Sequence, residues 1–369
     1  MLRLLIFTIF FTLKIQQLNA QILENPEVVE KIKKGISYIY NMDFVNAQNI
    51  YGYLIANYPN HPACDIFNAM IIYWKNYPLI PDKPASKEFE RILKNAINKV
   101  EDRYKIDSEN PENIICGIGS YGLLLLYLND NGFTNQVINY SLSCFKYVNR
   151  SFKYLNKYVD FNFVVGLYNY YIEAYPEKHP IYKPIKLILP SGNKETGLKQ
   201  LTIAAKNAIF IKAEAYNFLS FIYLNFESNY KEALECTKEL YLLYPENDVF
   251  LFNYIKMLLI TKDYKKAMEF TEKLHKENSN NKFFLGQYLL CKAIINEKYL
   301  NNYQEAEAYY QKSFNIFSLY GTFANELISY SLFGLSRIAQ NFSKDFKAAK
   351  VYRKNAEKLC KYKHITFDY

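Results

Sequence analysis

The chain has 369 residues, of which half are hydrophobic, and a formal net charge of +9 with basic and acidic residues interleaved along its length. A nucleic-acid-binding surface needs lysine and arginine concentrated on one face, so this dispersed charge argues against a nucleic acid as partner. The length is ample for a large core or for many stacked repeats.

The first twenty residues have the layout of a secretory signal peptide. Arg3 precedes an apolar run from Leu4 to Leu13, and polar residues then lead to the small residue Ala20. A membrane-spanning helix needs ~20 apolar residues, and Lys14 interrupts this run early. We therefore expect cleavage after Ala20 and export to the periplasm or the extracellular space. No later apolar run reaches spanning length, so we expect no transmembrane span after cleavage.

Small and aromatic residues at fixed spacing predict two packed helices within residues 28–61. Gly35 leaves room where the helices cross, and Ala47 is the small residue on the facing helix. Pro59 ends the second helix, because the residue before a proline is pushed out of the α region. The space around this contact is filled by Tyr38, Phe44 and Tyr51.

Residues 62–210 are expected to form less regular helical pairs with proline-rich insertions. Apolar residues at three- and four-residue steps predict helices that begin at Pro62 or cover Lys87–Tyr104, Ile114–Leu128, Thr134–Tyr147 and Phe161–Tyr175. Gly166 is expected at a helix crossing. Prolines at positions 176, 180, 184 and 190 are expected to break the chain before a helix that contains Leu198 and Ala205.

The spacing of the first pair returns in residues 211–369. Tyr230, Ala233 and Pro245 repeat its second half, and Tyr264 and Ala267 follow 34 residues later. Later second helices are expected to start at Tyr303 and Phe346, with Gly286 and Gly334 at crossing points. Residues Lys361–Tyr369 are expected to form a cap or a frayed tail.

This period and these residue types resemble the tetratricopeptide repeat, a helix–turn–helix unit that stacks into a superhelix. The resemblance implies an all-α fold, an α-solenoid of antiparallel helix pairs. The expected parts are a signal peptide (1–20), an N-terminal repeat-like unit (21–61), diverged pairs (62–210) and a C-terminal array (211–369). Residues 160–205 are also similar to a segment of the Iml-type tetratricopeptide proteins of the eukaryotic mitochondrial outer membrane and cytosol, a location that the signal peptide argues against.

The resemblance implies a concave groove lined by the first helix of each pair. Asn217, Phe221, Phe252 and Lys256 fall on groove-facing positions once the packing residues are assigned. One subclass grips a C-terminal carboxylate with Lys and Asn at such positions, a clamp that is absent here because the first pair has Ile32 and Ile36. The remaining groove is apolar and aromatic, which suits a helix or an extended apolar segment. Phe221 and Phe252 could instead pack between adjacent repeats, since aromatic stripes are usually core.

The sequence indicates no catalytic, metal or cofactor site. The four histidines, His61, His179, His275 and His364, fall in expected turns or in the tail and are interpreted as exposed loop residues. There is no phosphate-binding loop and no GxSxG nucleophile elbow. The six cysteines are separated by tens of residues, which predicts unpaired packing residues rather than a metal or redox site.

These observations predict an exported, non-enzymatic scaffold that binds another protein or a peptide segment in the cell envelope or outside the cell. The alternative is a carbohydrate-binding protein of the cell surface, resembling the SusD-type receptors that also embed such repeats. No cysteine follows Ala20 to carry the lipid usual in those receptors. Nothing in the sequence indicates an oligomeric state.

Overall fold

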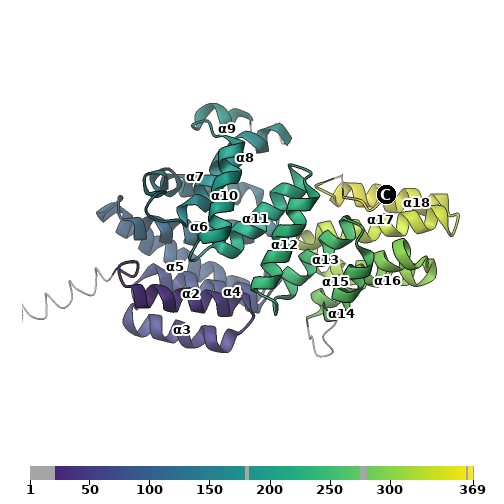
Figure 1. The fold of residues 1–369 in the computed structure, drawn as a ribbon, viewed down its shortest axis with the longest axis horizontal. Helices are drawn as coiled ribbons and strands as arrows, with labels where there is room; N and C mark the ends of the chain where they lie inside the picture. Colours follow the sequence, from purple (N-terminus) through teal and green to yellow (C-terminus); the bar gives the residue numbers. More distant parts are fainter. Residues whose placement is uncertain (1–20, 179–182, 275–280, 363–364, 369) are drawn as a thin grey trace, which may run out of the picture. The chain divides into compact units, whose positions relative to one another are not determined.

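The computed structural model describes residues 21–178, 183–274, 281–362 and 365–368, and every regular element in these ranges is helical (Figure 1). The expected all-α fold of paired helices is confirmed. The predicted signal peptide and three of the four histidines lie outside the described residues. The chain divides into two compact units: unit 1 holds residues 1–129 and 133–212, and unit 2 holds residues 130–132 and 213–369.

The first predicted pair is present as α2 (Pro26–Tyr40) and α3 (Phe44–Asn57). The side chains of Asn25 and Asp43 accept hydrogen bonds from backbone N–H groups in the first turns, which stabilises the helix starts. Gly35 makes room for two helices, since a Cβ there would lie 2.9 Å from Ile50 of α3 and 2.8 Å from the Phe67 ring of α4. The predicted crossing at Gly35 is confirmed.

Unit 1 continues with four helices that share an aromatic core. They are α4 (Pro62–Lys75), α5 (Pro84–Ile106), α6 (Pro111–Asp130) and α7 (Thr134–Ser151), followed by the short turn η1 (Phe152–Tyr154). Pro84 opens α5 three residues earlier than predicted, because a proline in the first turn loses no intrahelical hydrogen bond. The core between these helices includes Tyr73, Phe89, Tyr127 and Tyr147.

Among the described helices, α6 alone is long and apolar enough to cross a membrane, with a mean hydropathy of 1.2 over its best window. The expectation that no later apolar run reaches membrane-spanning length is therefore wrong for this helix. Of that window, 56% is buried in the structure, and Ile114, Leu124 and Leu128 belong to the aromatic core of unit 1. Such burial is typical of a core helix.

The last part of unit 1 contains α8 (Phe161–Lys178), α9 (Lys183–Ile188) and α10 (Lys194–Asn207). Two predicted breaks are wrong, because α8 continues through Pro176 and α9 contains Pro184. Both prolines lie near a helix end, where one missing N–H disturbs few hydrogen bonds. The crossing at Gly166 is confirmed, since a Cβ there would lie 3.0 Å from the backbone oxygen of Gly197 in α10.

The interpretation of His61 as an exposed loop residue is wrong. It is 4% exposed, and its Nδ1 accepts a hydrogen bond of 3.1 Å from the N–H of Ala63 at the start of α4. Its Nε2 lies 2.7 Å from Glu112 Oε1, and the other oxygen of Glu112 accepts from the N–H of Leu23 at 2.7 Å. His61 thus connects three segments of unit 1.

All six cysteines are buried and in the thiol form rather than in disulfides, as predicted. Burial raises the pKa of the Cys64 thiol to about 11 and that of Cys144 to about 12. Thiols with such pKa values stay protonated at neutral pH and are poor nucleophiles. The cysteines therefore serve as small apolar packing residues.

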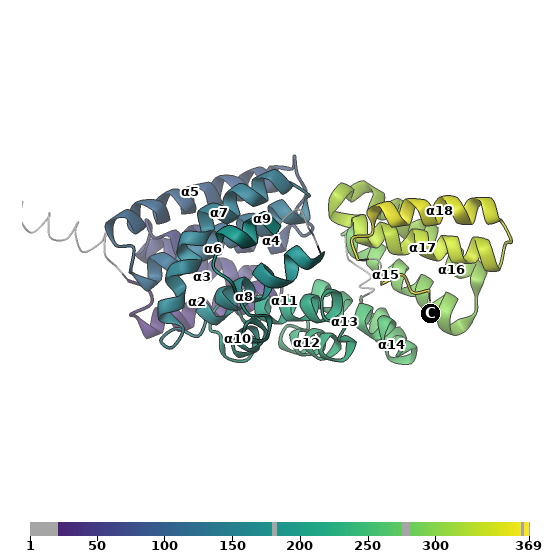
Figure 2. The same ribbon diagram turned by 90° about the horizontal axis from the view of Figure 1, so that it is seen from above.

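Unit 2 is built from helix pairs that pack in chain order (Figures 1 and 2). Its first helices are α11 (Lys212–Asn225), α13 (Asp248–Ile260), α15 (Lys282–Ile295) and α17 (Asn325–Asn341). Its second helices are α12 (Tyr230–Leu243), α14 (Tyr264–Leu274), α16 (Tyr303–Phe317) and α18 (Phe346–Leu359). A π-helical turn (Asn296–Leu300) extends α15, and a 3-10 segment (Ser318–Ala324) follows α16.

The second helices of unit 2 begin at the predicted aromatic residues. Each is preceded by an Asn or Asp whose side chain accepts a hydrogen bond from a first-turn N–H: Asn229, Asp263, Asn302 and Asp345. The crossings at Gly286 and Gly334 are confirmed. A Cβ at Gly286 would overlap the ring of Phe317, and one at Gly334 would overlap the ring of Tyr310. The first helices α13, α15 and α17 also contact one another in order, so they form a continuous layer.

Candidate functional site

The four predicted binding residues all lie on first helices of unit 2, but in different surroundings. Asn217 of α11 is exposed, and Phe221, one turn later, is half-buried. Phe252 of α13 is 4% exposed and packs in the interior. Lys256 of α13 has an 18% exposed side chain, and its Nζ lies 3.5 Å from Glu326 Oε1 of α17.

Phe252 and Lys256 take part in one surface, which we call the groove. It is formed by Phe252, Lys256 and Leu259 of α13, Leu290, Cys291 and Ile294 of α15, and Tyr330 of α17. A further residue, Phe367, comes from the end of the chain and fills this surface so that about 10 Å³ of free space remains. The groove is therefore occupied by Phe367 of the last segment of the chain, whose described residues, 361, 362 and 365–368, we call the tail.

The tail contacts the first helices through two aromatic side chains, Phe367 and Tyr362. Ile365 and Phe367 are 1% and 2% exposed. The Phe367 ring lies edge-on to Tyr330 of α17, with centroids 5.4 Å apart. Tyr362 makes the same kind of contact with Phe221 of α11, also at 5.4 Å. Edge-to-face pairs at this distance are favourable beyond the apolar area they bury.

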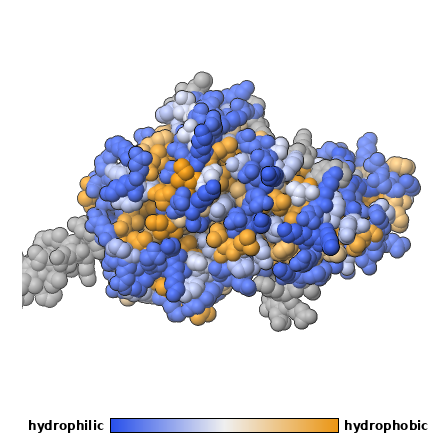
Figure 3. Space-filling view, viewed as in Figure 1, coloured by the Kyte–Doolittle hydropathy of each residue, from blue (hydrophilic) through white to orange (hydrophobic). Residues whose placement is uncertain are grey.

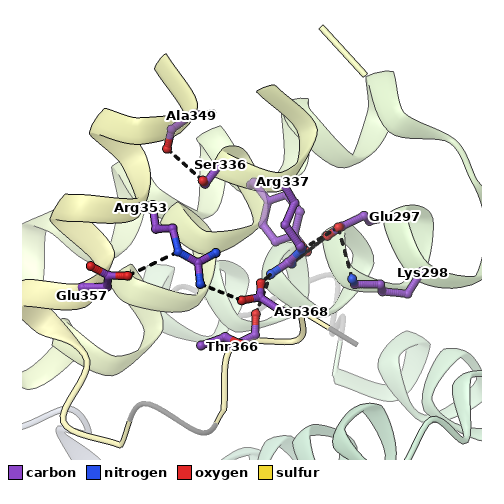
Figure 4. Close-up of polar contacts among 10 residues, drawn as sticks. Glu297, Lys298, Ser336, Arg337, Ala349, Arg353, Glu357, Thr366 and Asp368 are labelled. Atoms are coloured by element: carbon purple, nitrogen blue, oxygen red, sulfur yellow. Dashed lines mark hydrogen bonds and ion pairs between the residues drawn. The ribbon is translucent and has the colours of Figure 1, made fainter. Parts of the chain in front are cut away.

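Beside Phe367, the tail's polar groups meet two arginines (Figure 4). Arg337 of α17 donates to the carbonyl of Thr366 and, at 3.2 Å, to the Asp368 carboxylate. Arg353 of α18 donates to the other oxygen of Asp368 at 3.1 Å. Two guanidinium groups thus bind one backbone carbonyl and one carboxylate. Hydrogen bonds between charged partners are stronger than those between neutral ones.

Arg337 is fixed in place by a buried carboxylate. Its Nε and Nη2 donate to the two oxygens of Glu297 at 2.6 and 2.8 Å, and Tyr310 Oη donates to Glu297 at 2.7 Å. The side chains of Arg337 and Glu297 are 9% and 6% exposed. Only the Nη1 group of Arg337 faces the tail, so the direction of its hydrogen bonds is set before the tail binds.

Arg337 lowers the pKa values of the two carboxyl groups beside it, those of Asp368 and Glu297. Burial acts to raise the pKa of Asp368, but the charge of Arg337 and its hydrogen bond outweigh burial and hold the pKa below its usual value. The same balance of burial against Arg337 lowers the pKa of Glu297. Both groups are therefore carboxylates at neutral pH.

The backbone of the tail is also unusual at Phe367. Its φ is 55°, in the left-handed region that an aromatic residue rarely adopts. This conformation lets Phe367 enter the groove while the next residue, Asp368, reaches the arginines. Strained backbone of this kind persists only when surrounding contacts compensate for it.

Unit 1 contains a separate cleft of about 490 Å³, lined by apolar residues such as Ile115, Ile203 and Phe210. Its buried carboxylate, Asp160, accepts hydrogen bonds from the N–H groups of Ile209 and Phe210 at 3.0 and 2.7 Å. That carboxylate is therefore used to fix the chain after α10. Among the described residues, no group of three or more His, Cys, Asp or Glu is placed to hold a metal ion.

Apolar side chains also reach the outer surface, where Figure 3 shows them scattered among polar residues on the face drawn. The most exposed are Ile106, Val45, Leu319 and Phe346, at 85%, 76%, 67% and 65%. They belong to four different elements. Exposure alone therefore does not single out a docking surface, whereas the contacts of the tail converge on the groove.

Comparison with known proteins adds no relative: no protein-family model, no curated protein and no solved structure matches this chain. The groove must be interpreted from its own chemistry.

Sequence reasoning missed several residues of this site. Tyr330, Leu290 and Ile294 face the tail from first helices, and Arg337 and Arg353 bind its polar groups. A signal was present, because the last residues alternate an aliphatic, a polar and an aromatic side chain before an acid (Ile365 to Asp368). Such alternation is typical of an extended segment with one buried face.

Proposed function

We propose that this chain is an exported, non-catalytic scaffold of tetratricopeptide-like helix pairs whose groove in unit 2 binds an extended segment of another protein. The observation that carries the proposal is the tail itself. Phe367 of the tail lies in the groove with its ring buried, and the carboxylate of the next residue, Asp368, is held by two arginines. A surface with these properties suits a peptide of similar chemistry.

The surroundings of the groove support binding rather than catalysis. Lys256, Glu297 and Arg337 are engaged in ion pairs, and the thiol of Cys291 is buried with a strongly raised pKa. The helix pairs with residues such as Ala233 and Ala267 at a 34-residue interval support the repeat assignment. Export rests on the composition of the first twenty residues.

Photo-crosslinking in the native host tests this function. A photoreactive amino acid in place of the exposed Asn217, on the first helix α11, should form adducts with one or a few proteins. The matched control carries the same group in place of Leu242, which is 59% exposed on the second helix α12. Adducts of discrete mass at position 217 but not at 242 are expected. Equal adducts at both positions, or none at 217, would contradict a partner that follows the path of the tail, which passes Phe221 one turn after Asn217.

A further inference from the structure

We propose that the C-terminal tail is a built-in competitor for the groove, and that the natural partner presents the tail's pattern: an aliphatic residue, any residue, a phenylalanine-sized aromatic residue and then a carboxylate. This inference rests on the proposed function, since it names the chemistry of the partner for the same groove. It follows from what each contact of the tail would accept.

The aromatic position is selective for size. Phe367 is held between α13, α15 and α17, and the free space left beside it is about 10 Å³, no more than one small cavity for a water molecule. A larger ring such as that of tryptophan would have to displace well-packed helices, which is unfavourable in an interior of this density. A methyl group would leave most of the pocket empty. The groove therefore favours an aromatic residue of phenylalanine size.

The acidic position is selective for charge. Arg337 and Arg353 each donate to a different oxygen of Asp368, at 3.2 and 3.1 Å. Arg353 remains 45% exposed, so a partner carboxylate can reach it from solvent. An amide in this position can accept from one arginine with its oxygen, but it presents an NH₂ group to the other. The site therefore favours Asp or Glu after the aromatic residue.

The backbone is recognised as well. Arg337 donates to the carbonyl of Thr366, between the two buried side chains Ile365 and Phe367. A contact to a main-chain oxygen is independent of the side chain, which explains why the residue between the aliphatic and aromatic positions can be of any type. The pattern thus has three specified positions in four.

The tail is placed to compete because of its short tether. Only four residues separate Cys360, which follows α18, from Ile365. A short linker gives an effective concentration in the millimolar range, so a segment with a dissociation constant of 10–100 μM would bind the intact chain roughly 10- to 100-fold more weakly than the emptied groove. The strained φ of Phe367 disfavours the docked tail and so limits how strongly the tail competes.

A binding measurement on the full-length chain tests the inference. The probe is a fluorescent peptide with the sequence of residues 361–369, and the readout is anisotropy. The variant Phe367→Ala with Asp368→Asn weakens the chain's own tail and leaves every helix intact. We expect it to bind the wild-type peptide at least about tenfold more tightly than the wild-type chain does. A peptide carrying the same two substitutions should bind neither chain.

A single variant and a control peptide distinguish competition by the tail from a purely structural role. In the single variant Asp368→Asn, the buried Arg337 keeps its bonds to Glu297 and to the Thr366 carbonyl, so the melting curve should stay close to that of the wild type while the peptide affinity rises by a smaller factor. A control peptide with tryptophan at the phenylalanine position should bind more weakly than the wild-type peptide. If folded variants bind the peptide no better than the wild-type chain, the tail is only a structural cap. Such a failure together with adducts at position 217 would leave the proposed function standing.

Discussion

Gly166 of α8 and Gly197 of α10 lie face to face so closely that neither position has room for a side chain. A Cβ on Gly197 would lie 2.7 Å from the Gly166 carbonyl oxygen and 2.7 Å from the backbone nitrogen of Tyr170. These obstacles are backbone atoms, which cannot rotate away as a side chain can. The close packing of α8 on α10 therefore depends on this pair of glycines.

Replacing Gly197 with alanine should destabilise unit 1. We expect the free energy of unfolding to fall by about 1–3 kcal/mol, the usual cost of overpacking, measured by urea denaturation followed by circular dichroism. The matched control is Gly52→Ala in α3, where a Cβ would meet nothing within 4 Å. In that helix alanine should stabilise by about 0.5–1 kcal/mol. Equal effects at the two positions would show that the helix crossing is misplaced.

The helices could largely be predicted from the sequence, because their boundaries depend on local residues. The start of α14 at Tyr264 follows from the spacing of the repeat and from Asp263 as its cap. The prolines predicted helix boundaries less well, since Pro84 begins a helix and Pro176 lies inside one. Which end of a helix a proline occupies is decided by packing that the local sequence does not show.

The site was less predictable because its contacts join distant parts of the chain. His61 was interpreted as an exposed loop residue, but it is buried against Glu112, which lies 51 residues away in the sequence. The alternation in the tail does not show what covers its buried face, and the burial of Phe367 depends on three helices, α13, α15 and α17, of which the first begins at Asp248. Phe252 and Lys256 were placed on the layer of first helices from repeat spacing, and their contacts with the tail required the structure.

His61 should make the stability of unit 1 depend on pH. Burial lowers its pKa from the usual 6.5, although the hydrogen bond to Glu112 acts in the opposite direction. The unfolded chain therefore takes up a proton more readily as the pH falls below 6.5, so stability present above this value is lost on acidification, by at most about 1.4 kcal/mol per pH unit.

The variant His61→Asn separates titration from helix capping. Asparagine is a good N-cap residue and carries no titratable group. Its unfolding free energy should be lower than that of the wild type at pH 7.5 but should change less between pH 7 and pH 5, as followed by urea denaturation at each pH. A wild-type curve that rises toward pH 5 would contradict the direction of the pKa shift.

The ion pair between Glu297 and Arg337 should be essential for folding of unit 2. Glu297→Ala leaves a buried guanidinium without its main partner, and breaking such a pair costs about 3–5 kcal/mol. The exposed pair of Lys199 and Glu195 provides the comparison, because Glu195→Ala removes only a solvent-exposed i,i+4 contact, which contributes little to stability. Thermal melts of the two variants should therefore differ strongly, with Glu297→Ala much the less stable.

The most direct measurement of the groove as a protein-binding site combines variants of the tail and of the first helices in one capture experiment. The full-length Phe367→Ala, Asp368→Asn chain, immobilised and exposed to native extract, should retain more of the protein identified by crosslinking at position 217 than the wild-type chain retains. Adding Phe221→Ala should abolish that gain, since Phe221 lines the path of the tail on α11. Adding Phe346→Ala, an exposed aromatic on the second helix α18, should leave the gain intact. A gain that survives Phe221→Ala would contradict binding in the groove, whereas equal capture by the wild-type chain and the folded tail variant would contradict competition by the tail.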